Sequence, residues 1–363
     1  MHTTTKKIES KLANLSSSSY LLNRDFLIFD IETTGFSREY DFIYMIGCIY
    51  KKDHGYEYCN LFANSPSDEC EIILTFFKML KDFDCLIHFN GNRFDIPFLL
   101  ARATKHNIAN QLSHMESIDI YDLLRPFRKY LDFPNLKLDT IQNQLGYLRK
   151  DTYTGGDLIQ VYQNYVRKPY QPYYDLLLLH NKEDVEGMIH LLPFIDIFIL
   201  IDHLILKEDF KFLTIEQGDN SLKILYSLPY KADMSLQLSY GGSLFKLISA
   251  SDVASLTLPL CQDKKKLFFD NYKDYMYLPE KDEVVHKSIA AFIPADKKIK
   301  AKKSNCYISH TGDFIPIFSL KDITRPFTDD FKSKDYYTVL EPTLDTNFFN
   351  NQLIGFLKTC KQS

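Results

Sequence analysis

The stretch Phe26-Leu27-Ile28-Phe29-Asp30-Ile31-Glu32-Thr33-Thr34-Gly35 decides the fold of this chain. Its apolar start predicts a buried strand. Side chains alternate between the two faces of a strand, so Asp30 and Glu32 project from the same face. Two such carboxylates repel each other and are costly to desolvate unless a cation lies between them. Because Mg²⁺ and Mn²⁺ prefer carboxylate oxygens, the pair predicts a metal site. The alternative is a solvated strand end with two surface acids.

A second apolar run, residues 84–89, is followed by Asn90-Gly91-Asn92-Arg93-Phe94-Asp95. Asn-Gly is a strong turn signal. Asp95 stands at the start of an amphipathic stretch that predicts a helix to about Asn107. The alternative for Asp95 is an ordinary helix N-cap.

The third segment is Leu176-Leu177-Leu178-Leu179-His180-Asn181-Lys182-Glu183-Asp184-Val185-Glu186, within a predicted helix that begins near Tyr173. His180 and Asp184 are four residues apart and therefore share one helical face. A metal-dependent hydrolase needs such a pair, because the carboxylate completes a metal site while the imidazole orients or deprotonates water. The alternative is an exposed face on which His180 has no role. Glu183 and Glu186 are expected to point away and to be solvated.

Together these segments resemble the motifs of the DEDD superfamily of 3′→5′ exonucleases, which have the ribonuclease H-like fold. Asp30-x-Glu32-Thr-Thr-Gly is similar to the first motif. Asn90-x-x-x-Phe94-Asp95 is similar to the second, in the form also seen in proofreading domains of B-family DNA polymerases. His180-x-x-x-Asp184 is similar to the third, but a histidine stands at the spacing of the tyrosine subclass. That hybrid is similar to the bacterial YprB-like group, and the resemblance covers roughly residues 24–197.

The resemblance implies a two-metal mechanism. Asp30, Glu32, Asp95 and Asp184 would hold two Mg²⁺ or Mn²⁺ ions about 4 Å apart. His180 would position a metal-bound water or accept its proton, and the second ion would stabilise the leaving 3′ oxygen. Further residues expected to cradle the terminal nucleotide are Thr33, Thr34, Gly35, Asn90 and Asn92. For Asp119 and Asp122, which follow a predicted core strand, a strand-end cap is the expected role.

The pattern along the chain predicts a mixed-sheet α/β domain of the ribonuclease H-like class, followed by a smaller β-rich domain. The expected division is an N-terminal extension at 1–23, the exonuclease domain at 24–207 and an accessory domain of unknown task at 208–363. Strands are predicted at 26–31, 42–50, 56–63, 84–89 and 117–120, and helices at 68–82, 95–107, 137–146, 156–166 and 173–206. Residues 147–156 are expected to form a surface loop beside the site.

The second half shows short apolar runs separated by polar turns, which predicts a β-rich module. Residues 284–292 are expected to form a helix, and 306–309 and 314–318 to flank a turn at Thr311-Gly312-Asp313. Two lysine runs, 264–266 and 297–303, lie near frequent tyrosines and phenylalanines. Lysines with exposed aromatics can hold single strands of nucleic acid. Because the chain has no tryptophan, the alternative is that these aromatic rings fill a core.

Composition sets broad limits on the function. With 45% apolar and 25% charged residues, the chain has an ordinary globular composition. No stretch is expected to be long enough to span a membrane. Polar residues interrupt the most apolar region, 188–206, which is predicted to be a buried helix. The seven cysteines form no CxxC pair, which argues against a zinc site or disulfide framework and predicts free thiols in a reducing cytoplasm. The net charge of −4 decides little, because bound metal inverts the local sign.

The expected function is hydrolysis of phosphodiester bonds from a 3′ end of DNA or RNA, with single-stranded nucleic acid as the partner. Two alternatives remain on the same fold. One is a structure-selective endonuclease, since the metal site serves either cut. The other is a catalytically inactive nucleic-acid-binding module, which the presence of all four carboxylates disfavours. A sugar-phosphate or nucleotide enzyme fits poorly, because the chain has no glycine-rich phosphate loop.

Overall fold

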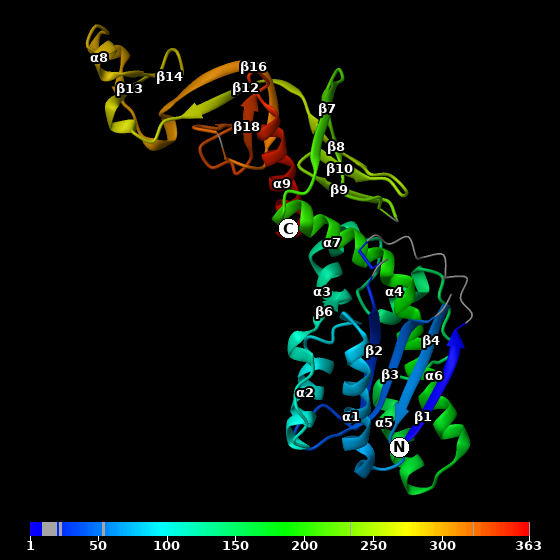
Figure 1. Ribbon diagram of the computed structural model, residues 1–363. Coiled ribbons are helices and arrows are strands. Elements are labelled where there is room, and N and C mark those ends of the chain that lie inside the picture. Colours follow the sequence, from blue (N-terminus) through cyan, green and yellow to red (C-terminus); the bar gives the residue numbers. More distant parts are fainter. Residues whose placement is uncertain (9–19, 22–23, 53–54, 233, 322, 363) are drawn as a thin grey trace. The chain divides into compact units, whose positions relative to one another are not determined.

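The computed structural model describes residues 1–8, 20–21, 24–52, 55–232, 234–321 and 323–362. The chain forms two compact units (Figure 1). Unit 1 comprises Met1–Leu200 with Ala232–Met234, and unit 2 comprises Ile201–Lys231 with Ser235–Ser363. Each unit has its own sheets and its own buried apolar residues. We describe them separately.

A six-stranded mixed sheet forms the centre of unit 1, in the order β1-β4-β3-β2-β5-β6. Its strands are β1 (His2–Ile8), β2 (Phe26–Thr33), β3 (Ile43–Lys52), β4 (Gly55–Phe62), β5 (Cys85–His88) and β6 (Glu116–Asp119). The meander β2-β3-β4 is antiparallel, and β5 and β6 add in parallel to β2. The sheet matches the mixed arrangement predicted from the sequence. Residues 2–8, which the sequence placed in an extension, pair with β4 as an edge strand.

The central strand β2 is apolar because the sheet is covered on both faces. Leu27, Ile28 and Phe29 are fully buried. The strand carries its acids only at its C-terminal end, and the register with β3 shifts between Glu32 and Thr33. Such a bulge bends a strand and re-aims the side chains beside it.

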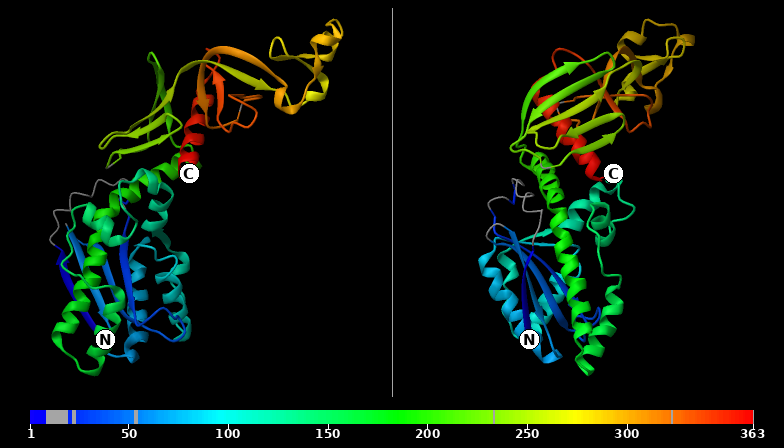
Figure 2. Two further views of the ribbon diagram at one scale, coloured as in Figure 1. Left: turned by 180° about the vertical axis from the view of Figure 1, so that it is seen from behind. Right: turned by 90° about the vertical axis from the view of Figure 1, so that its right-hand side faces the viewer.

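Helices cover both faces of this sheet (Figure 2). On one face lies α1 (Glu69–Met79), which packs on β3 and β4, and it is joined by α2 (Asp95–Lys105). The other face is covered by α6 (Gln171–Met188), which crosses β2, β3 and β4 and packs against α4 and α5. The remaining helices of this half are α3 (Ile120–Leu124), α4 (Leu138–Gln144), α5 (Gly155–Arg167) and α7 (Leu192–Leu206). All the helices predicted for this half are present, with ends shifted by a few residues.

The helical stretch Gln171–Leu206 is long and apolar enough, by length and composition alone, to cross a membrane. The expectation that no stretch reaches that length was therefore wrong. Its most apolar window has a mean hydropathy of 2.0, and 61% of that window is buried inside the protein. The core helix of a globular protein has the same properties, so the finding is weak evidence for a membrane span.

Unit 2 is rich in strands, as predicted. A five-stranded antiparallel sheet has the order β7-β8-β11-β10-β9, a small closed barrel the order β12-β16-β18-β17, and a three-stranded sheet the order β14-β13-β15. The strands are β7 (Lys211–Gln217), β8 (Ser221–Ser227), β9 (Leu236–Tyr240), β10 (Ser243–Leu247), β11 (Val253–Pro259), β12 (Cys261–Phe268), β13 (Tyr275–Leu278), β14 (Glu283–His286), β15 (Ile299–Lys300), β16 (Tyr307–Ile317), β17 (Phe327–Thr328) and β18 (Tyr336–Val339). Alternate side chains of β8 and β11 are buried, which is the pattern of a sheet with one covered face.

Two local expectations for unit 2 were wrong, and one helix was not predicted. Residues 284–292 contain strand β14 and only a short helix, α8 (Lys287–Ala290). The expected turn at 311–313 is the middle of the continuous strand β16. All of β12 pairs with residues 307–314 of β16, so the chain does not turn there. The C-terminal helix α9 (Thr346–Gln362) was not predicted, and it buries Phe349 beside Tyr226 of β8, whose hydroxyl donates to the Phe349 carbonyl (2.8 Å).

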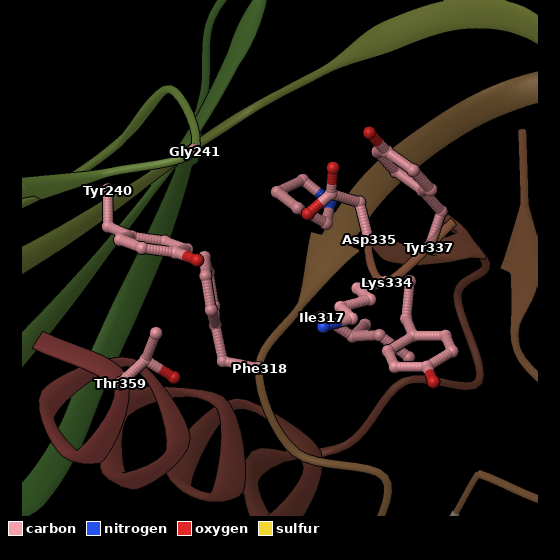
Figure 3. Close-up of a pocket in the computed structure, with 10 residues that line it drawn as sticks. Tyr240, Gly241, Ile317, Phe318, Lys334, Asp335, Tyr337 and Thr359 are labelled. Carbon is pink, nitrogen blue, oxygen red and sulfur yellow. The ribbon is translucent and has the colours of Figure 1, made fainter. Parts of the chain in front are cut away.

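A pocket of about 290 Å³ lies in unit 2 between the β9–β10 turn, the end of β16, β18 and α9 (Figure 3). The rings of Tyr240 and Phe318 form one wall, in edge-to-face contact with centroids 6.3 Å apart. Gly241 in the turn has a φ of +54°, a left-handed conformation that favours glycine. Lys334 and Asp335 stand at the exposed rim.

Candidate metal-dependent active site

Three separate segments of unit 1 bring four carboxylates together. Asp30 and Glu32 come from the end of β2, Asp95 from the first residue of α2, and Asp184 from the middle of α6. We call these four residues the acidic cluster. Each of the three other carboxylates raises the pKa of Asp30 through its charge, so all four lie within electrostatic reach of one another. The sequence predicted all four as metal ligands.

The electrostatics of the acidic cluster are those of uncompensated negative charge. Burial raises the pKa of Glu32 to about 7, and Asp184 and Asp95 add to the rise while His180 opposes it. Burial also raises the pKa of Asp95 to about 7, although its hydrogen bond from the Ile31 backbone lowers it. The pKa values of Asp30 and Asp184 are raised as well, chiefly by burial. A cation among these groups would favour their ionised forms.

The carboxylate of Asp95 is tied directly to strand β2. Its Oδ1 accepts a hydrogen bond from the backbone N–H of Ile31 at 3.2 Å, between the two acids of the first motif. It does not act as an N-cap, because the cap position of α2 is Phe94. The interpretation of Asp95 as a simple helix cap is therefore excluded.

A buried amide orients Asp30. Asp30, Gly47 and Asn60 face one another across β2, β3 and β4, and Asn181 of α6 reaches over the glycine between them. Its Nδ2 donates to Asp30 Oδ2 at 3.1 Å, and its Oδ1 accepts from Asn60 Nδ2 at 3.3 Å. The Tyr58 hydroxyl donates to the same oxygen at 3.3 Å. A Cβ on Gly47 would lie 1.7 Å from Asn181 Oδ1, so only glycine fits there.

His180 lies against the acidic cluster. Its Nε2 is 3.2 Å from Asp184 Oδ2 and 3.7 Å from Glu32 Oε1. Its other ring nitrogen, Nδ1, is 2.5 Å from Asp151 Oδ2. Burial lowers the pKa of His180, but the neighbouring carboxylates of Glu32, Asp184 and Asp151 outweigh it, and the net shift is upward.

The loop between α4 and α5 completes this arrangement, as the sequence predicted for a loop beside the site. Arg149 ion-pairs with Asp184 Oδ1, and Asp151 contacts His180. Glu183 of α6 anchors the loop, because its carboxylate accepts from the backbone N–H groups of Lys150 (3.0 Å) and Asp151 (2.9 Å). The expectation that Glu183 is solvated was wrong, since it is only 5% exposed. Glu186 is half-buried and pairs with Lys182 at 2.8 Å.

The residues present fit a bound divalent cation. Glu32, His180 and Asp184 each offer one ligand atom, and these atoms lie within 4.8 Å of one another. Next to them the Tyr44 hydroxyl is fully buried, and it has no hydrogen-bond partner among the described residues. Burial raises the pKa of Tyr44, and the charge of Glu32 adds to the rise, so the hydroxyl lies near that carboxylate. The Glu32 carboxylate is within reach of this hydroxyl as a hydrogen-bond acceptor.

The residues predicted to cradle a nucleotide shape the turns around the cluster. The Thr33 hydroxyl donates to the Gly35 carbonyl at 2.7 Å, and the Thr34 N–H donates to the Phe42 carbonyl at 3.0 Å. Asn90 has a φ of +61°, which its turn requires. The amide side chain of Asn92 donates to Asp122 Oδ2 at 3.1 Å.

Asp119 has the capping role expected for it. Its carboxylate accepts from the N–H groups of Tyr121 and Asp122 at the start of α3. It also accepts from the N–H groups of Asn90 (2.8 Å) and Asn92 (3.1 Å), and so holds the turn of the second motif. Asp122 forms an ion pair with Arg93 at 2.7 Å.

The lysine runs of unit 2 are partly structural. Lys265 is buried and pairs with Asp329 at 2.5 Å, and Lys298 donates to the backbone carbonyl of Ile293 at 2.7 Å. The nearby aromatic rings pack on the buried residues Val284, Ala301 and Cys306; they are Phe269, Tyr272, Tyr275 and Tyr277. The interpretation of these rings as core filling is confirmed.

The comparisons with known proteins agree with this architecture. Residues 27–195 match the model of a family described as the RNase_H superfamily. Unit 1 is an RNase H-like domain.

Two solved structures resemble the chain more loosely. The family B DNA polymerase from the hyperthermophilic archaeon Pyrobaculum calidifontis is 17% identical with a TM-score of 0.39, over 68% of this chain and 34% of the polymerase. Exonuclease I, from a structure described as suggesting how processivity is achieved, is 10% identical with a TM-score of 0.34, over 56% of this chain and 55% of its own. The chain thus spans about a third and about half of these two proteins. No curated protein matches it.

Sequence reasoning missed four residues of the RNase H-like domain's site: Arg149, Asp151, Asn181 and Glu183. The only signal in the loop was its charged sequence Arg149-Lys150-Asp151, which equally fits a solvated surface. Asn181 is next to His180 in the third motif, and in the structure it packs over Gly47 of β3. A glycine in a strand can mark a close approach by another element, but the sequence does not say which helix makes that approach.

Proposed function

We propose that this chain is a metal-dependent 3′→5′ exonuclease that hydrolyses phosphodiester bonds of DNA or RNA. One observation carries the proposal: four carboxylates from three distant segments converge with a histidine at the end of the central strand of an RNase H-like sheet. Their pKa values are raised together, chiefly by burial and also by their mutual repulsion, and a bound cation would relieve both effects. The resemblance of all three motifs to the DEDD exonucleases supports the polarity.

In this proposal Asp30, Glu32, Asp95 and Asp184 hold two divalent ions, Mg²⁺ or Mn²⁺. Such ions lower the pKa of a bound water and stabilise the charge on a leaving 3′ oxygen. Asn181 fixes the orientation of Asp30 through its amide. Arg149 takes one oxygen of Asp184 and leaves the other facing His180.

An exposed aromatic ring beside the acidic cluster supports a nucleic-acid substrate. Phe36, directly after the first motif, is 85% exposed, and its ring meets that of Phe94 edge-to-face at 6.1 Å. Exposed rings of this kind stack on nucleobases without regard to sequence. The guanidinium group of Arg38, which donates to the Arg93 carbonyl at 3.2 Å, lies beside the second motif and can contact a phosphate.

The test is digestion of a single-stranded oligonucleotide labelled at the 5′ end in one reaction and at the 3′ end in another, with Mg²⁺, Mn²⁺ or EDTA. We expect a ladder that shortens from the 3′ end, requires metal and is lost in Asp30→Asn. Parallel DNA and RNA substrates decide the sugar preference.

Two results would contradict the proposal. Internal cleavage products would identify an endonuclease that uses the same metal site. Failure to cut DNA or RNA with either metal, in protein shown to be folded by circular dichroism, would identify a binding module.

A further inference from the structure

The imidazole of His180 has the surroundings of a metal ligand. The DEDD resemblance implies that His180 positions a metal-bound water or accepts its proton. Here Nε2 faces two carboxylate oxygens directly, Asp184 Oδ2 at 3.2 Å and Glu32 Oε1 at 3.7 Å. The side chain is only 10% exposed, so the nitrogen has little access to bulk water. His180, Glu32 and Asp184 each offer one ligand atom, and these atoms lie within 4.8 Å of one another.

The separations match those between ligands of one ion. Nitrogen and oxygen ligands of Zn²⁺ or Mg²⁺ lie about 2.1 Å from the metal, so neighbouring ligands are about 3.0 Å apart in an octahedron and about 3.4 Å apart in a tetrahedron. The distance from Nε2 to Asp184 Oδ2, 3.2 Å, lies between these values, and the distance to Glu32 Oε1, 3.7 Å, is a few tenths of an ångström above them. A histidine that only activates a metal-bound water would need room for that water between its nitrogen and the carboxylates.

The other ring nitrogen has the partner that a ligating histidine requires. Metal-bound histidines almost always donate their second N–H to a carboxylate or carbonyl, which fixes the tautomer and strengthens the ligand. An ionised carboxylate only accepts, so Asp151 at 2.5 Å from Nδ1 assigns a proton to Nδ1. A cation bound at Nε2 would take the place of any proton that this nitrogen shares with Asp184. Glu183 holds the backbone of Asp151 and thereby fixes this contact.

The buried Tyr44 hydroxyl is an independent observation at the same place. It has no partner among the described residues, and it lies near Glu32. When Glu32 gives one oxygen to a cation, its other oxygen needs a hydrogen-bond donor, and a phenol supplies one.

We propose that His180 is a direct ligand of one divalent ion through Nε2, together with Glu32 and Asp184, and that Asp151 positions it. This inference rests on the proposed function, which supplies the metal ions. It goes beyond that function by adding His180 to the ligands. A site with two carboxylates and one imidazole binds Mn²⁺ or another transition ion more tightly than Mg²⁺, because imidazole is a poor ligand for Mg²⁺. The ion held here is therefore of the transition-metal class.

The experiment is pulsed electron paramagnetic resonance on the full chain, stripped with EDTA and reloaded with Mn²⁺. We expect electron spin-echo modulation from one directly bound ¹⁴N, which is lost in His180→Gln. The matched control is His114→Gln, an exposed histidine of the same unit, and it should keep the modulation. Bound Mn²⁺ without ¹⁴N modulation in the unaltered protein would overturn the inference and leave the proposed function intact. Failure to bind Mn²⁺ at all would overturn both.

Calorimetric titration tests the role of Asp151. Asp151→Ala should weaken Mn²⁺ binding about 10–100-fold, the usual effect of removing the partner of a ligating histidine. Asp151→Asn, whose amide oxygen can still accept from Nδ1–H, should recover part of that loss. The control Asp157→Ala removes an exposed carboxylate that accepts hydrogen bonds from the backbone N–H and the hydroxyl of Thr154, and it should leave the affinity unchanged. Equal Mn²⁺ affinities for Asp151→Ala and the unaltered protein would contradict a positioning role.

Discussion

Two groups of buried charges in the RNase H-like domain have opposite electrostatics. One is the acidic cluster. The other, the Glu69 cluster, consists of Glu69 with Arg102 and His106, and its carboxylate also accepts from the Ile43 N–H at 2.8 Å. Burial raises the pKa of Glu69, but its partners outweigh burial and the net shift is downward. In the acidic cluster the pKa values are raised.

The difference lies in whether the protein supplies the compensating charge. Glu69 has a cation or a donor for each of its oxygens, so its negative charge is satisfied within the fold. Among the described residues, the four carboxylates of the acidic cluster have two cationic partners, Arg149 and His180, and neutral donors from Asn181 and the Ile31 N–H. A buried charge without a partner is costly, and we propose that an external cation supplies the charge that the acidic cluster lacks. The following predictions test this contrast.

Asp95→Asn should give the largest effect. Removing one ligand charge should lower metal-dependent hydrolysis by at least about a thousandfold, since a metal contributes several kcal/mol to such reactions. The melting temperature should not fall, because the substitution relieves repulsion. The control is Asp122→Asn, which breaks an exposed ion pair with Arg93. Activity within tenfold of the unaltered protein would contradict the metal assignment.

Arg102→Met should act on stability instead. It leaves Glu69 buried without its main partner, and breaking a buried ion pair from one side costs about 3–5 kcal/mol. Urea unfolding measures this loss, and the matched control Arg93→Met, at an exposed pair, should cost less than about 1 kcal/mol. Mn²⁺ affinity of the folded protein should not change. If Arg102→Met lost metal binding but kept its stability, the Glu69 cluster would belong to the metal site and would not be a structural ion pair.

Asn181→Leu and Gly47→Ala should weaken the metal site without touching a ligand. Leucine removes the amide that orients Asp30, and a methyl group at position 47 displaces the same amide. We expect metal affinity to fall about 10–100-fold in either variant. Calorimetry against Gly55→Ala, where the nearest atom to a new Cβ is 3.7 Å away, provides the control. Unchanged affinity in both variants would show that Asp30 needs no orienting partner.

The two clusters should respond to pH in opposite directions. Glu32 and Asp95 have pKa values raised to about 7, so the metal-free folded protein binds more protons than the unfolded chain, and its free energy of unfolding falls as pH rises from 5 to 8. Glu69 has a lowered pKa, so its stabilising contribution is present above pH 4.5 and is lost as pH falls below that.

Urea unfolding in EDTA at pH 5.5 and pH 8 measures this dependence, which we expect to be about 1–3 kcal/mol. Asp95→Asn should reduce it, because one of the groups with a raised pKa is gone. Added Mn²⁺ should raise the stability more at pH 8 than at pH 5.5, since protons compete with the metal. An equal effect of Mn²⁺ at the two pH values would show that these carboxyl groups do not bind it.

The sequence by itself predicted five of the six strands of the sheet in the RNase H-like domain, all but the edge strand β1, and the residues of the acidic cluster. Both rest on local patterns: the apolar run before Asp30, the alternation that puts Glu32 on the same face, and the helical spacing of His180 and Asp184. Unit 2 was harder to predict, because its strands are short and their turns weakly marked. The strand β16 crosses a Thr-Gly-Asp sequence typical of a turn, since pairing with β12 overrides local preference.

Only the tertiary structure decided which groups surround the four carboxylates. Asn181 reaches Asp30 because a glycine lies between them across three strands. Asp151 and Arg149 reach His180 and Asp184 because Glu183 anchors their loop on the same helix. These contacts join residues about 30 to 150 positions apart, and no local pattern records them. Covalent spacing fixes which face of a strand or helix a side chain occupies, whereas the packing of distant elements fixes what that face meets.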